Sequence, residues 1–124
     1  MTTEMRIVTA GLLFMAALSS GIWLNRLGRP LNTLIFTLHK LIALAAVVLV
    51  ALAIVQLLKG QAPTTLRLVA MAAAGLFVLV SFATGAWLSI VKSAPPVASI
   101  THKIMPALMA AATAAAIYLL AAGA

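Results

Sequence analysis

Two histidines are the residues of this chain whose type and spacing best suit metal or cofactor binding. A Gly-x-Trp-Leu sequence occupies positions 21–24 and returns at 85–88. Each copy is followed by a His-Lys pair, His39-Lys40 in the first and His102-Lys103 in the second, 18 and 17 residues after the glycine. The chain has no other histidine. Because both imidazoles occupy the same place in a repeat, we expect them to act as a pair.

The composition argues against most other site chemistry. The chain has no cysteine and no aspartate, and Glu4 is its only acidic residue. A structural zinc site takes four protein ligands and a catalytic one three, which this inventory does not supply. A proton-coupled exporter needs a carboxylate inside the membrane, and hydrolysis or group transfer needs an acid, a base or a nucleophile. Two imidazoles do match an iron porphyrin held by one histidine on each face.

The residues around the histidines are those of a membrane protein. Of the 124 residues, 65% are hydrophobic and 7% are charged. A water-soluble domain of this length could not bury so much apolar surface, so lipid is the solvent that fits. In lipid the backbone must satisfy its own hydrogen bonds, and long runs of Ala, Leu and Val favour helices over a barrel. The net charge of +7 comes from basic residues at the ends of these runs, where they anchor helices, so nucleic acid is not an expected partner.

The order of apolar runs and turns predicts an all-α fold. We expect a single integral-membrane domain of four helices, at about 6–27, 31–58, 65–92 and 96–122. Short connections make consecutive helices antiparallel, which gives an up-down-up-down transmembrane bundle. Pro30 suits the first turn of the second helix, with Asn32 or Thr33 as its N-cap. Thr64 or Thr65 can cap the third helix.

The two halves of the chain, 1–60 and 64–124, are copies of one helical hairpin. The first and third helices align at a constant offset of 64 and the second and fourth at 63. The matched pairs include Ala10/Ala74, Gly11/Gly75, Ser20/Thr84, Gly21/Gly85, Trp23/Trp87, His39/His102, Lys40/Lys103 and Ala53/Ala116. Such a repeat predicts two hairpins related by a pseudo-twofold axis along the membrane normal.

This symmetry places the imidazoles at one depth. The second and fourth helices run in the same direction, and each histidine lies roughly 9–13 Å from the start of its helix. Diagonal helices of a bundle are about 11–14 Å apart, which leaves room for one haem b between His39 and His102. Gly21 and Gly85 lie at a similar depth, and a helix without a side chain there would let the edge of the macrocycle pass.

Basic residues near the histidines can pair with the haem propionates. Lys40 and Lys103 adjoin the ligands, and Arg26 and Arg29 lie on the same side of the membrane. Pro106, four residues after His102, should kink the fourth helix.

Each feature also has a plain structural interpretation. A histidine near a helix end can be an interfacial residue, and a lysine beside it an anchor. The glycines can be helix-packing residues, and Trp23 and Trp87 belong to an aromatic belt. For the histidines, their pairing within the repeat favours haem ligation.

With these residues the chain resembles four-helix membrane b-type cytochromes. They include the ascorbate-linked cytochromes, the bacterial superoxide oxidases and the copper-resistance CopD-like proteins. The resemblance covers the four-helix architecture and the facing pair His39 and His102, with the Gly-x-Trp-Leu and His-Lys elements as local likenesses. It implies haem between transmembrane helices. Many of these proteins have four ligating histidines and two haems, whereas this chain has ligands for one.

The leading hypothesis is a single-haem cytochrome of the bacterial inner (cytoplasmic) membrane. It would exchange single electrons with a quinone or a soluble redox protein, as an electron carrier rather than an enzyme. Ligation on both faces leaves no open iron position for oxygen. The alternatives are a non-redox membrane scaffold or subunit, including a minimal designed bundle, and a haem storage or sensing protein. A homo-oligomer is compatible with each of them.

Overall fold

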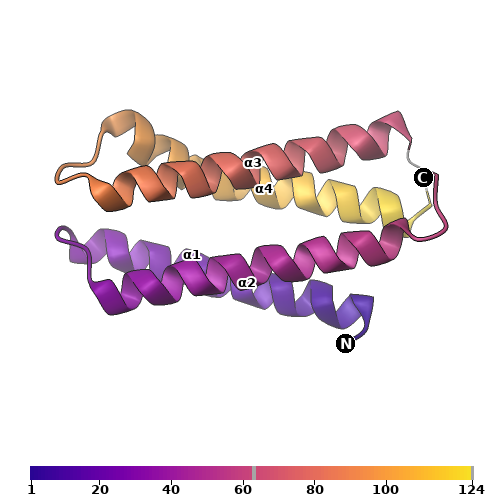
Figure 1. The fold of residues 1–124 in the computed structure, drawn as a ribbon, viewed down its shortest axis with the longest axis horizontal. Coiled ribbons are helices and arrows are strands. Elements are labelled where there is room, and N and C mark those ends of the chain that lie inside the picture. Colours follow the sequence, from indigo (N-terminus) through magenta and orange to yellow (C-terminus); the bar gives the residue numbers. More distant parts are fainter. Residues whose placement is uncertain (63, 124) are drawn as a thin grey trace. The chain divides into compact units, whose positions relative to one another are not determined.

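The computed structural model describes residues 1–62 and 64–123, and within them it contains four long α-helices and no strand (Figure 1). The helices are α1 (Thr3–Leu27), α2 (Thr33–Leu58), α3 (Thr65–Ile90) and α4 (Pro96–Ala121). The predicted all-α fold is confirmed, and each predicted boundary is within three residues of the observed one. Helix α4 continues through Pro106 without ending there.

Polar side chains decide where three of the helices begin. The Thr2 hydroxyl accepts a hydrogen bond from the backbone N–H of Met5 at the start of α1. Asn32 Oδ1 accepts from the N–H of Ile35, and Thr64 Oγ1 accepts from the N–H of Arg67. Asn32 and Thr64 are therefore the caps among the candidates that the sequence left open.

Proline precedes the start of α2 but is the first residue of α4. Helix α2 begins at Thr33, so the prediction that Pro30 lies in its first turn is wrong. Pro30 instead belongs to the preceding loop, because Asn32 is the residue that caps the helix. In α4 the first residue is Pro96, where the missing N–H would have had no partner within the helix.

All four helices are long and apolar enough to cross a membrane. Each has 25 or 26 residues, which corresponds to roughly 38 Å. Large aliphatic side chains point outward: Leu12 is 67% exposed and Leu79 is 68% exposed. The buried positions are held mostly by alanine, which lets helix backbones approach closely in lipid. This arrangement is that of an integral membrane protein.

The chain divides into two compact units, Met1–Gln56 and Leu57–Ala124. In the first unit α1 packs against α2, and in the second α3 packs against α4, each pair forming an antiparallel hairpin (Figure 1). The internal repeat is visible in the buried positions of the two hairpins. Matched residues are buried in both copies: Ala10 and Ala74, Ile35 and Ala98, Ala53 and Ala116. The two helices of each hairpin thus pack against one another through faces that are equivalent in the repeat.

Candidate functional site

The two histidines occupy equal positions in their helices. His39 is the seventh residue of α2, which begins at Thr33, and His102 is the seventh residue of α4, which begins at Pro96. Each lies six residues beyond the first residue of its helix, a rise of about 9 Å. Both rings are partly buried and lie near the turn of their own hairpin. The expected equivalence of the two positions is confirmed within each hairpin.

In the first hairpin the His39 ring is bonded to the neighbouring helix. Its Nδ1 lies 2.9 Å from the backbone carbonyl oxygen of Ala17 and 3.0 Å from Ser20 Oγ, both on α1. A carbonyl oxygen can only accept a hydrogen bond, so Nδ1 carries a proton and donates it. The Ser20 hydroxyl donates its own hydrogen to the Ala17 carbonyl at 3.0 Å. Its oxygen can therefore also accept from Nδ1–H.

The second hairpin repeats this bonding pattern. His102 Nδ1 lies 3.0 Å from the carbonyl oxygen of Ser81 and 3.1 Å from Thr84 Oγ1, both on α3. The Thr84 hydroxyl donates to the carbonyls of Val80 at 2.8 Å and Ser81 at 3.1 Å. Ser81 and Thr84 align with Ala17 and Ser20 at the offset of the repeat. Each hairpin thus holds its imidazole with one carbonyl and one hydroxyl of the partner helix.

This bonding selects the tautomer of each ring. A neutral imidazole protonated at Nδ1 has its lone pair on Nε2. Histidines that bind metals commonly donate their other N–H to a carbonyl or carboxylate, which orients the ring and makes the ligating nitrogen more basic. The contacts of His39 and His102 through Nδ1 are of this kind. In this tautomer Nε2 is the ring nitrogen that can accept a hydrogen bond or bind a metal.

Glycine allows each imidazole to lie against the neighbouring helix. A Cβ atom on Gly21 would lie 3.0 Å from His39 Cε1, and one on Gly85 would lie 3.0 Å from His102 Cε1. Gly11 and Gly75 also lie within helices, but a Cβ there would meet no atom within 4 Å. The sequence led us to expect that Gly21 and Gly85 leave space for the edge of a macrocycle. The structure shows a nearer occupant, because the ring of the histidine itself fills that space.

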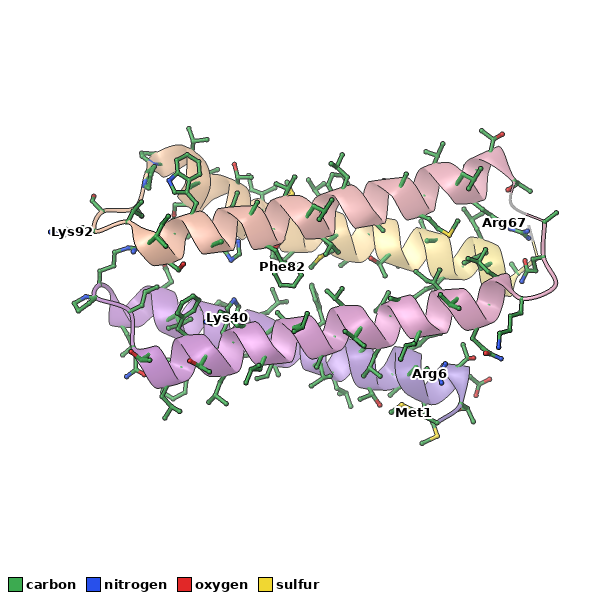
Figure 2. The ribbon with its side chains drawn as sticks, in the orientation of Figure 1. Met1, Arg6, Lys40, Arg67, Phe82 and Lys92 are labelled. Carbon is green, nitrogen blue, oxygen red and sulfur yellow. The ribbon has the colours of Figure 1, made fainter. Side chains whose placement is uncertain are left out.

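The basic residues predicted to pair with propionates are at the hairpin turns. Arg26, Arg29, Lys40 and Lys103 are exposed. Lys40 Nζ lies 4.5 Å from the centre of the Phe36 ring, one helical turn earlier. Figure 2 shows Lys40 in the part of α2 that follows the first turn. These cations lie beside the histidine level of their own hairpin, where exposed acidic groups of a cofactor or partner could reach them.

Three polar residues of the hairpins make contacts that the sequence did not predict. Ser20 and Thr84 are a matched pair in the repeat, and each lies directly before a paired glycine. This position was the signal in the sequence that could have predicted their contacts with His39 and His102. A basic residue at the end of an apolar run is expected to be an exposed anchor, whereas Arg67 is only 5% exposed. The described residues contain no cluster of three or more His, Cys, Asp or Glu side chains.

Comparison of this chain with protein families, with curated proteins and with solved structures finds no match.

Proposed function

We propose that this chain is a membrane b-type cytochrome that binds one haem b through His39 and His102 and transfers single electrons. The observation that supports this most strongly is the repeated fixation of the imidazoles. In both hairpins Nδ1 donates to a carbonyl and a hydroxyl of the partner helix at 2.9–3.1 Å. A purely interfacial histidine would not need the same two bonds, and the same glycine beneath it, in each copy.

The available ligands fit a haem better than a bare metal ion. One imidazole from each hairpin would hold the iron, and the porphyrin would supply its remaining ligands. When bound, the haem iron provides the one-electron step. The protein holds the rings at a set rotation through the Nδ1 bonds, and its apolar helices keep water away from the cofactor.

The exposed cations would bind the acidic edge of the same haem. Lys40 and Lys103 directly follow the ligands, and Arg26 and Arg29 come from the turn of the first hairpin. The chain has eight basic residues against one acidic residue, so hardly any acidic side chain of the chain itself would compete with the propionates for these cations. Charge-assisted bonds to the propionates would set the orientation of the macrocycle.

An electron carrier of this kind needs one partner that donates electrons and one that accepts them. A histidine on each face leaves no open iron position, so the electron donor and acceptor would react at the edge of the haem. A quinone in the same leaflet or a soluble protein docking at the basic turns could fill these roles. The resemblance to bacterial membrane cytochromes favours the bacterial inner membrane as the location.

The visible spectrum of the purified protein tests this proposal. We expect paired bands of a low-spin haem after expression or reconstitution, and we expect His39→Ala and His102→Ala each to abolish them. Gly11→Ala is the matched control, because a Cβ at Gly11 meets nothing within 4 Å. A colourless wild-type protein that resists reconstitution with haem, while it remains folded by circular dichroism, would exclude the proposal.

The second candidate is a membrane scaffold or subunit without redox activity. It is favoured by one surface of α4, where Ala110, Ala111, Ala114 and Ala115 are exposed. Small exposed residues allow another transmembrane helix to approach closely. For this candidate we expect a featureless spectrum together with a stoichiometric partner chain in native mass measurements. A haem storage or sensing protein would show the same bands as a cytochrome but exchange electrons slowly with quinols.

A further inference from the structure

The second unit buries one cation far from its histidine. Arg67 is the third residue of α3 and, among the residues that the structure describes, the only buried side chain that is charged or polar. Its position on α3 is eighteen residues before Gly85, which faces His102. That separation corresponds to about 27 Å along the helix. Arg67 therefore lies at the end of its hairpin remote from the turn that holds Lys92 (Figure 2).

At this end of the second hairpin, Arg67 and Gln61 each have one polar atom without a hydrogen-bond partner among the described residues. Arg67 Nη1 donates to the carbonyl oxygen of Ala62 at 2.9 Å. Gln61 Nε2 donates to the carbonyls of Leu57 at 2.7 Å and Leu120 at 2.9 Å. Arg67 Nε and Gln61 Oε1 are both buried and have no hydrogen-bond partner among the described residues. One donor and one acceptor are thus withdrawn from water without replacement, which is costly in a folded protein.

The charge of Arg67 is also not balanced by an acidic side chain of its own unit. Residues 57–124 contain no aspartate and no glutamate. The backbone amide of Arg67 lies in the first turn of α3, where it donates to Thr64. The positive end of a helix dipole therefore adds to the charge of the guanidinium. A buried cation at the N-terminal end of a 26-residue helix is an environment that favours an anion.

The geometry of the guanidinium indicates which anion. With Nη1 bonded to Ala62, the edge formed by Nε and Nη2 is the one whose Nε donor has no partner. Nε is covered by neighbouring atoms. Once those atoms move aside, this edge can donate two parallel hydrogen bonds to a group with two oxygens, such as phosphate. The residues that flank Arg67 in sequence, Thr64 to Leu66 and Leu68, are exposed. Arg67 is therefore buried just beneath the surface of the hairpin end, where lipid headgroups lie around a membrane protein.

We propose that Arg67 binds a phosphate group at this end of the hairpin. The phosphate can come from a phospholipid headgroup or from free phosphate in solution. The site is separate from the proposed haem site and does not depend on it, because it lies at the other end of α3. It would tie the α2–α3 connection to the lipid surface and would complete the bonding of the guanidinium.

Lipid and phosphate binding to the full chain can be measured separately. One arm uses nanodiscs of phosphatidylcholine with and without added phosphatidylglycerol, in phosphate-free buffer. The other arm uses inorganic phosphate against sodium chloride at equal ionic strength, in a detergent without phosphate. The readouts are lipids retained in native mass spectra and the thermal unfolding midpoint, neither of which requires haem.

We expect wild-type protein to retain phospholipid or to be stabilised by phosphate, whichever source is correct. Arg67→Gln should weaken that binding by about 10-fold or more, as expected for loss of a charge-assisted pair. Arg67→Lys keeps the charge but loses the fork and should be intermediate. Lys59→Gln removes an exposed charge from the residue that directly follows α2 and should bind like wild type.

Three results would overturn the proposal. Wild-type protein that neither retains phospholipid nor responds to phosphate would show that no such anion binds. Equal losses in Arg67→Gln and Lys59→Gln would show that only general charge attraction is present. Equal binding by Arg67→Gln and wild type would exclude the guanidinium as the ligand. If the Arg67 variants fail to fold, the wild-type comparison of phosphate with chloride still decides whether phosphate binds, and the lack of any difference would overturn the proposal.

Discussion

The imidazole of His39 lies directly over Gly21 of the neighbouring helix, where a Cβ atom would be 3.0 Å from its Cε1 atom. His102 and Gly85 repeat this relationship with the same distance. A contact of 3.0 Å to a Cβ is tighter than nearly all Cβ contacts in proteins, so the ring would have to shift by a few tenths of an ångström. Since the ring is bonded through Nδ1 to the same helix, that shift would strain those bonds.

Alanine at these glycines should therefore destabilise the hairpins. We expect Gly21→Ala and Gly85→Ala each to cost about 1–3 kcal/mol, as overpacking does elsewhere. Gly11→Ala and Gly75→Ala are matched controls and should stabilise by about 0.5–1 kcal/mol, since alanine is the better helix former and meets no atom within 4 Å. Unfolding in mixed detergent measures both sets. If all four variants behave alike, the histidine contact has no energetic role.

The hydroxyls bonded to Nδ1 should tune the two rings. Ser20→Ala and Thr84→Ala each remove one of two acceptors and should cost about 1 kcal/mol of stability. In the haem-bound protein the loss makes Nε2 less basic and favours ferrous iron, so we expect the reduction potential to rise. A redox titration of the visible bands measures this shift. Ser19→Ala is the control, because Ser19 bonds only the Met15 carbonyl on its own helix and should leave the potential unchanged.

The N-caps give a prediction in which neighbouring residues serve as controls. Asn32→Ala and Thr64→Ala each remove a side-chain acceptor from a first-turn N–H and should cost about 1 kcal/mol. Thr33→Ala and Thr65→Ala alter the adjacent residues of the same two helix starts and should change stability by less than about 0.5 kcal/mol. Thermal unfolding of the four variants compares them. A larger loss at Thr33 or Thr65 would contradict the observed caps.

The cations beside the ligands should raise the reduction potential of a bound haem. Lys40→Gln and Lys103→Gln each remove a positive charge near the proposed site, which favours the ferric form, so the potential should fall. At about 10 Å in water the effect is on the order of 0.5 kcal/mol, and it should shrink as salt is added. Lys59→Gln removes a charge just beyond the C-terminal end of α2 and is the control. An unchanged potential at low salt in both variants would place these lysines away from the cofactor.

Much of this protein follows from its residue order alone. Runs of Ala, Leu and Val bounded by basic and proline-containing turns indicate four helices, because only helices satisfy the backbone in lipid. The repeat places His39 and His102 at the seventh position of their helices, and that equivalence follows from the alignment. The capping residues could be narrowed to two candidates each, since only a few side chains accept bonds from first-turn amides.

Only the tertiary structure shows which face of each helix is buried, because these helices are apolar on every side. A soluble helix reveals its buried face by a polar stripe opposite, whereas here Ala10 is buried and Leu12, two residues later, is 67% exposed. Contact faces in lipid are selected by the size of the side chain, so polarity does not mark them. The carbonyl of Ala17 that holds His39 is a backbone group, which every residue has, so no residue type could reveal it. The hydrogen bond from Gln61 to the Leu120 carbonyl of α4 is likewise a long-range contact that local sequence does not contain. The burial of Arg67 is also not marked by its residue type, because arginine is usually exposed.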